Sequence, residues 1–129
     1  MANHAVLDAS ALLALLNSEP GTEVVAQALH HGATMSAVNY SEVVGKLRES
    51  GIALDEVMEI LRPLNIQIVA FTEAQAVRAG DLRPATKSSG LSLGDRACLA
   101  LAEELGVPAL TADRDWRAVT IGVTIQVIR

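Results

Sequence analysis

Short apolar runs alternate along the chain with longer segments in which apolar positions recur at helical spacing. The short runs are typical of β-strands and the longer segments of α-helices. The expected strands are Ala5 to Leu7, Thr34 to Ser36, Ile66 to Ala70, Ala109 to Thr111 and Thr124 to Ile128. This alternation predicts an α/β fold, a three-layer αβα sandwich whose mostly parallel central sheet carries helices on both faces.

Capping residues and helix breakers set the bounds of the helices. The expected helices are Ser10 to Leu16, Pro20 to Leu29, Val38 to Glu49, Leu54 to Leu61, Thr72 to Leu82 and Ser92 to Leu105. Thr72 and Ser92 are favourable N-caps, and Gly106 stands where a helix commonly ends. The segment from Pro84 to Gly90 is rich in helix breakers and is predicted to be a surface loop. No internal repeat or linker is visible, so residues 1–129 are expected to form a single domain.

The charge balance limits how the chain could hold nucleic acid. It has 10 basic and 15 acidic residues, a net charge of −5, which is the wrong sign for binding RNA by bulk charge. Aromatic residues make up only 2%, which argues against a base-stacking platform. Any RNA contact must therefore be local, with Arg83, Lys87 and Arg96 as the expected RNA-binding residues. Arg78 is a further candidate for this basic rim, although a solvated helix surface explains all four.

The apolar content bears on assembly and location. Half of the residues are hydrophobic, so we expect some apolar surface to face another subunit. Cys98 is the single cysteine, which excludes an internal disulfide, and it is expected in the core. The longest apolar runs fall far short of the ~20 residues of a membrane-spanning helix. Residues 1–4 lack the start of a signal peptide, so a cytoplasmic protein without membrane association is expected.

Four acidic residues occupy positions where strands end or helices begin. Asp8 directly follows the first strand, and Asp113 follows the fourth strand after one residue. Glu42 and Asp95 lie in the opening turns of two helices. Because ligands in open parallel sheets sit at the carboxyl ends of the strands, the four side chains are predicted to converge on one rim, where Thr111 could add a hydroxyl.

Asp8 and Asp113 each have a simpler explanation. Asp8 could cap the helix that follows it, although Ser10 is an equally good cap two residues later. Asp113 could cap a short helical turn, and Asp115 is a competing acid two residues away.

Glu42 and Asp95 also have structural alternatives. Glu42 falls opposite the apolar stripe of its helix, where it could pair with Lys46 on a solvated face. Asp95 stands three residues after Ser92, which is close to the capping-box pattern. The signal lies in the order of the four acids, their spacing and their α/β setting.

Carboxylates without histidine or cysteine suit a hard cation such as Mg²⁺ and make a poor zinc site. Bound divalent metal can generate a nucleophilic water near neutral pH and stabilise charge on phosphate oxygens. The histidines His4, His30 and His31 show no zinc-ligand spacing and are expected in surface or structural roles.

Four motifs resemble the ordered acidic motifs of PIN domains. They are Val6-Leu7-Asp8-Ala9-Ser10, Ser41-Glu42, Leu91-Ser92-Leu93-Gly94-Asp95 with Ala97, and Leu110-Thr111-Ala112-Asp113. Each motif is short, but as an ordered set they are specific and span nearly the whole chain. The length of the chain and Trp116 look like the bacterial VapC branch, the toxin half of VapBC-type toxin–antitoxin pairs.

The resemblance implies a metal-dependent endoribonuclease that cuts single-stranded RNA with Mg²⁺ or Mn²⁺. It also implies a homodimer and a small antitoxin partner that blocks the acidic pocket. Carried over by position, Asp8 and Asp95 are the principal metal ligands, and Glu42 and Asp113 complete the set. By the same resemblance the set is supported by Ser10 and Thr111, while Asp115 corresponds less clearly.

Three alternatives remain. A receiver domain normally has paired acids after its first strand and a lysine after a late strand, whereas the only lysines here, Lys46 and Lys87, are badly placed. A haloacid dehalogenase-type hydrolase would need a second Asp at Ser10. A catalytically silent PIN-like binding module ranks second to the nuclease, because it would have no need for the repulsion among four clustered acids.

Overall fold

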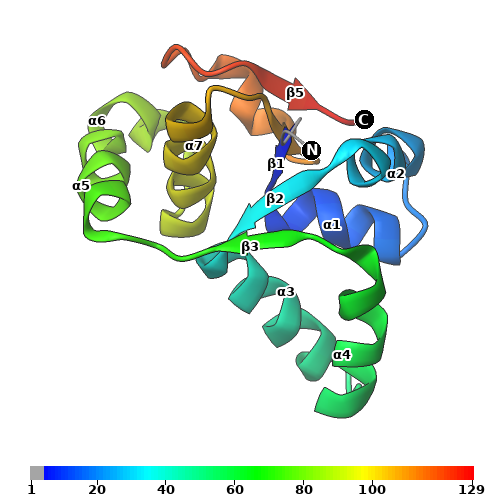
Figure 1. Ribbon diagram of the computed structural model, residues 1–129. Helices are drawn as coiled ribbons and strands as arrows, with labels where there is room; N and C mark the ends of the chain where they lie inside the picture. Colours follow the sequence, from blue (N-terminus) through cyan, green and yellow to red (C-terminus); the bar gives the residue numbers. More distant parts are fainter. Residues whose placement is uncertain (1–4) are drawn as a thin grey trace.

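The computed structural model describes residues 5–129, so the expectations for His4 and for the start of the chain lie outside the described residues (Figure 1). The strands are β1 (Ala5–Leu7), β2 (Ala33–Ser36), β3 (Gln67–Val69), β4 (Ala109–Thr111) and β5 (Ile125–Val127). They form one sheet in the order β3-β2-β1-β4-β5, and each neighbouring pair is parallel. The predicted parallel sheet is confirmed, and no strand end deviates from its expected bound by more than one residue.

Helices cover both faces of this sheet. They are α1 (Ala9–Leu16), α2 (Thr22–His31), α3 (Ala37–Glu49), α4 (Leu54–Leu61), α5 (Glu73–Asp81), α6 (Arg83–Thr86) and α7 (Leu93–Leu105), with 3-10 turns η1 (Arg62–Leu64), η2 (Lys87–Ser89) and η3 (Arg114–Ala118). Figure 1 shows α5, α6 and α7 gathered on one side of the sheet and α1 to α4 on the other, with α3 and α4 projecting from the body. The predicted three-layer αβα sandwich is therefore confirmed.

The central strand β1 separates two hydrophobic cores. Because successive side chains of a strand point to opposite faces, Leu7 joins the core beneath α1 to α4, whereas Val6 joins the core beneath α5 to α7. The second core contains the fully buried Trp116 and Cys98, which confirms the expected place of the cysteine. Both faces of β1 are thus held in packed apolar surroundings.

The segment from Pro84 to Gly90 differs from its prediction. It is not a loop but consists of α6 and η2. Pro84 stands in the first turn of α6, where the missing backbone N–H breaks no helical hydrogen bond. The Thr86 hydroxyl donates to the Leu82 carbonyl at 2.8 Å, and Gly90 ends the segment at φ +70°. Helix breakers here set the ends of short helical turns.

The start of α2 also differs. The helix begins at Thr22, two residues after Pro20, because Gly21 takes a left-handed conformation with φ +96° and forms its N-cap. The Thr22 hydroxyl donates to the Glu19 carbonyl at 2.7 Å and closes the turn before the helix.

The order of the strands in the sheet indicates where a ligand would bind. From β1 the chain proceeds to β2 on one side, whereas β4 pairs with β1 on the other. The carboxyl ends of β1 and β4 therefore form the topological switch point, the usual ligand position in such sheets. Across residues 5–129, no helix has the length and apolar character needed to cross a bilayer.

Candidate active site

A pocket of about 220 Å³ opens at the carboxyl ends of β1 and β4. It is lined by Asp8, Ala9, Ser10, Leu13, Glu42, Lys46, Asp95 and Asp113. We call it the carboxylate pocket. All four of the predicted acids line it, although they come from four separate segments of the chain.

Asp8 is the most buried of the four acids. Its side chain is 2% exposed and forms the N-cap of α1, with Oδ1 accepting the Ala11 N–H at 2.8 Å. The suggestion that Ser10 could cap the helix instead was wrong, because Ser10 lies within α1. The Ser10 hydroxyl turns back to Asp8, at 2.8 Å from Oδ1 and 2.9 Å from Oδ2. Asp8 therefore has a structural role in addition to its place in the pocket.

Burial dominates the ionisation of Asp8. It raises the pKa of this carboxyl from 3.8 to about 6, and the charge of Asp95 adds to the rise. Hydrogen bonds from Thr111, Ala11 and Ser10 act in the opposite direction, because they stabilise the charged form. Desolvation outweighs them, so the Asp8 carboxylate lacks a compensating positive charge.

Two hydroxyls tie Asp8 to the end of β4. The Thr111 hydroxyl donates to Asp8 Oδ2 at 2.6 Å, and its oxygen accepts the backbone N–H of Asp113 at 3.0 Å. The Ser10 oxygen accepts the Ala112 N–H at 2.9 Å in the same way. These bonds hold the loop that carries Asp113 against the loop that carries Asp8.

Asp113 and Asp115 have different positions. Asp113 caps η3, with Oδ1 accepting the Asp115 N–H at 2.9 Å, so the predicted helical turn is present. Asp113 still lines the carboxylate pocket. Asp115 is exposed and lies outside that pocket.

Asp95 combines the two interpretations that the sequence left open. Its carboxylate accepts the Ser92 N–H at 2.9 Å and its N–H donates to the Ser92 hydroxyl at 3.2 Å, which completes a capping box at the start of α7. Desolvation nevertheless raises the pKa of Asp95, and the charge of Asp113 adds to the rise. Asp95 is both a helix cap and an incompletely compensated acid of the pocket.

Asn39 and Gly94 set the position of Glu42, although the sequence did not predict a role for either residue. Asn39 is 1% exposed, and its Nδ2 donates to Glu42 Oε1 at 3.0 Å and to the Gly94 carbonyl at 2.9 Å. A Cβ on Gly94 would lie 2.5 Å from Glu42 Oε1, so any other residue here would displace the Glu42 carboxylate from its present position. A glycine in the first turn of a helix, where it lowers helix stability, was the available signal for this close contact.

The basic residues near the predicted site lie in different surroundings. Lys46 lines the carboxylate pocket with Glu42, and among residues 5–129 it forms no ion pair. Arg96 is 7% exposed, and its Nη1 donates to the Ala79 carbonyl at 2.9 Å, so its guanidinium serves the contact between α7 and α5. Arg83 and Lys87 are exposed but do not line the pocket.

Other predicted residues also lie elsewhere. Arg78 is engaged by Glu103 at 2.6 Å and Asp81 at 2.8 Å on the outer surface of α5. His30 and His31 end α2 in contact with each other and are exposed, as expected for surface histidines.

The donors in the carboxylate pocket fit a hard divalent cation. They are oxygen atoms, and burial raises the pKa of both Asp8 and Asp95, so the charged forms of these two acids are incompletely stabilised in the pocket. Within residues 5–129, however, no three His, Cys, Asp or Glu side chains already stand close enough to form a ready-made metal site.

A family model for the PIN domain matches residues 5–122. The chain belongs to the PIN-domain family. Receiver and dehalogenase alternatives are thereby excluded. Among curated proteins, this PIN-domain chain is 32% identical over 120 residues to ribonuclease VapC42 of Mycobacterium tuberculosis, covering 86% of this chain and 92% of that protein. A VapC ribonuclease of Mycobacterium bovis matches equally well.

Solved structures agree on the fold. DNA-bound VapBC from Salmonella typhimurium superposes with a TM-score of 0.74 at 14% identity, covering 98% of each chain. VapC20 from Mycobacterium tuberculosis, described as a sarcin-ricin loop cleaving toxin, gives a TM-score of 0.69 at 19% identity, with 88% of this chain and 93% of that chain covered.

Proposed function

We propose that this PIN-domain chain is a metal-dependent endoribonuclease that cuts single-stranded RNA and acts in the cytoplasm as the toxin of a toxin–antitoxin pair. The observation that carries the proposal is the meeting of Asp8, Glu42, Asp95 and Asp113 in one pocket at the switch point of the sheet. Relatives that are named ribonucleases and match over most of the chain support the same activity.

Asp8 and Asp95 are the principal ligands of Mg²⁺ or Mn²⁺ in this proposal, and Glu42 and Asp113 complete the set. The bound cation supplies an activated water and charge stabilisation on the phosphate oxygens. The oxygen-only donor set favours Mg²⁺ or Mn²⁺ over zinc.

The surrounding residues orient these acids. Ser10 and Thr111 hold the Asp8 carboxylate from two sides, so that its rotamer is set before any ligand arrives. Asn39 does the same for Glu42 and ties it to the first turn of α7, which carries Asp95. Such hydrogen bonds to ligand side chains normally strengthen metal binding.

The partners in this proposal are an antitoxin and a second copy of the chain. The VapBC structures that share this fold are toxin–antitoxin complexes. An antitoxin segment that crosses an apolar groove and places a basic side chain on the acids would match the uncompensated charge at Asp8 and Asp95. Exposed Leu54 and Ile60 on α4 provide apolar surface for a protein partner.

Purified protein should cleave single-stranded RNA in the presence of Mg²⁺ or Mn²⁺ and stop when EDTA is added. Asp8→Asn should lose this activity, because it removes ligand charge while keeping the shape of the side chain and its capping oxygen. Cleavage that survives chelation would overturn the metal mechanism. An inactive wild type that still binds RNA would favour the silent binding module.

Expression in bacteria tests the partners. The chain alone should arrest growth, and co-expression with the antitoxin should relieve the arrest, while light scattering at micromolar concentration should report a homodimer. A harmless, monomeric protein would contradict both parts of the assembly proposal.

A further inference from the structure

A second, larger pocket adjoins the carboxylate pocket. It measures about 570 Å³ and is lined by Ser10, Pro20, Ala112, Asp113, Arg114 and Arg129. We propose that this arginine pocket binds a phosphate and its nucleotide next to the scissile position of the RNA, with Arg114 as the phosphate-binding residue. The inference rests on the proposed nuclease function and assigns the part of the substrate that the carboxylates do not hold.

The two pockets are adjacent. Ser10 and Asp113 line both of them, so these residues form a shared wall. An RNA strand whose scissile phosphate reaches the acids extends in both directions from that point. The arginine pocket offers a neighbouring nucleotide a volume typical of ligand sites in proteins.

Arg114 is suited to hold a phosphate. It is exposed, and it immediately follows Asp113, so the position of η3 fixes it beside the acids. Its Nε donates to the backbone oxygen of Arg129 at 3.3 Å, while among residues 5–129 no acidic side chain forms an ion pair with its guanidinium. The terminal nitrogens of such a guanidinium can grip phosphate oxygens in a fork.

The segment that ends at Arg129 is held against the start of α2. Gly21 makes this possible, because a Cβ there would lie 2.7 Å from the Ile128 carbonyl oxygen and from its Cγ1. Arg129 then pairs with Glu19 at 3.0 Å, which fixes its guanidinium and partly offsets its charge. Arg129 therefore lines the pocket, and its backbone oxygen holds the Arg114 side chain. We expect Arg129 to contribute less than Arg114 to phosphate binding.

The net charge and the low aromatic content of the chain indicate how the arginine pocket would hold RNA. The chain has a net charge of −5, so cations beside the acids are needed to hold a polyanion locally. Only 2% of the residues are aromatic, so flanking bases would find few rings to stack on, whereas the planar face of an arginine accepts a base. Arg96, one of the predicted RNA contacts, is buried, which leaves Arg114 as the exposed arginine next in sequence to a pocket acid.

A substrate-modification cycle tests the contact directly. A neutral methylphosphonate is placed at each linkage in turn on either side of the cleavage site of a single-stranded RNA. For wild-type protein, one flanking position should lower kcat/KM about tenfold. Arg114→Ala should show the same tenfold loss on unmodified RNA and no further loss when the methylphosphonate occupies that position. The loss should appear in KM rather than kcat.

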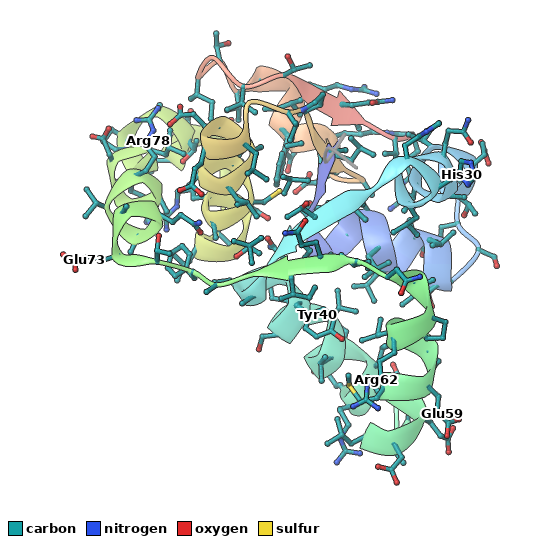
Figure 2. The ribbon with its side chains drawn as sticks, in the orientation of Figure 1. His30, Tyr40, Glu59, Arg62, Glu73 and Arg78 are labelled. Atoms are coloured by element: carbon teal, nitrogen blue, oxygen red, sulfur yellow. The ribbon has the colours of Figure 1, made fainter. Side chains whose placement is uncertain are left out.

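Salt dependence and matched variants give independent readouts. Arg114→Ala should reduce the slope of log binding constant against log salt by about 0.7, as expected for one lost phosphate contact on a single strand. Arg114→Lys should recover part of the affinity. The control is Arg62→Ala, which removes an exposed arginine of η1 at the end of α4. Arg62 lies far from the β5 end of the molecule in Figure 2, and its removal should change neither the slope nor KM.

The outcomes separate the two proposals. Wild-type protein that cleaves RNA while Arg114→Ala behaves like Arg62→Ala would overturn the arginine pocket and leave the nuclease proposal standing. Methylphosphonate effects of equal size in wild type and Arg114→Ala would also overturn it. Wild-type protein that cleaves no RNA in Mg²⁺ or Mn²⁺ would overturn both.

Discussion

The two ends of α7 carry acids in opposite electrostatic states. Near its carboxyl end, the Glu103 carboxylate accepts hydrogen bonds from Arg78 Nε at 2.6 Å and Arg78 Nη2 at 2.7 Å. This contact lowers the pKa of the glutamate. Figure 2 places Arg78 on α5, the helix that lies beside α7. At the amino end, the pKa of Asp95 is raised, because burial and the charge of Asp113 outweigh its hydrogen bonds to Ser92.

We propose that the contrast separates an acid that serves only the fold from an acid that also serves a ligand. Evolution can neutralise a surface carboxylate with an arginine, as at Glu103, with a gain of at most about 1 kcal/mol for such an exposed pair. The acids of the carboxylate pocket lack that partner, although Lys46 lines the same pocket. Uncompensated carboxylates in a cleft mark a functional site.

The largest expected effect is on RNA cleavage, which should depend on the acid at the amino end of α7 and not on the acid at its carboxyl end. Asp95→Asn should lower kcat/KM for RNA cleavage about a thousandfold, roughly 4 kcal/mol of transition-state stabilisation, because it removes a ligand charge. Glu103→Gln, a similar neutralisation on the same helix, should leave cleavage within twofold of wild type. Initial rates on one RNA substrate in Mg²⁺ measure both. Equal losses would mean that the comparison reflects general destabilisation of α7.

The fold was predictable because the local signals agree with the tertiary structure. The caps at Thr72 and Ser92 and the stop at Gly106 begin and end α5 and α7 where the sequence indicated. The segment from Pro84 was not predictable in this way, since proline and glycine mark the ends of short helical turns as readily as they mark loops.

The site was predictable as a set of acids, but its supports were not. Periodicity alone puts Glu42 on a solvated face, and it is indeed exposed, yet that face borders the pocket. Nothing local in the sequence shows that Asn39 reaches across to Gly94, because this contact joins residues that are 55 positions apart. For the same reason, the burial of Arg96 beneath α5 depends on packing between helices and not on helical spacing.

The pH dependence of stability should differ in sign between the two kinds of acid. In metal-free protein, the pKa of Asp8 rises from 3.8 to about 6 on folding, so the folded state binds more protons between these values. The free energy of unfolding should therefore fall as the pH rises from about 4 to 6, by up to about 3 kcal/mol. The lowered pKa of Glu103 acts in the opposite direction, and its effect is small because the pair is exposed.

Urea unfolding in EDTA across this pH range measures the slope. Asp8→Asn should flatten it, since asparagine can still cap α1 but does not titrate. Glu103→Gln should leave it in place. A wild-type stability that rises between pH 4 and 6, or a slope that survives in Asp8→Asn, would mean that the buried carboxylate is compensated by a group other than those that contact it.

The smallest expected effect concerns the stability that Asp95 contributes with and without metal. Its capping box favours the folded state, but its raised pKa indicates that the charged form is disfavoured overall in the pocket. In EDTA at neutral pH, Asp95→Asn should therefore unfold at a temperature a few degrees above wild type, a gain of about 1 kcal/mol, because asparagine keeps an acceptor for the Ser92 N–H and removes the repulsion from Asp113. Excess Mg²⁺ should reverse the order, since a ligand that binds only the native state stabilises the wild type by its own affinity. Thermal melts of both proteins in EDTA and in Mg²⁺ decide between the two roles: a variant that is less stable in EDTA and gains as much from Mg²⁺ as the wild type would leave Asp95 as a helix cap alone, no different in kind from Glu103.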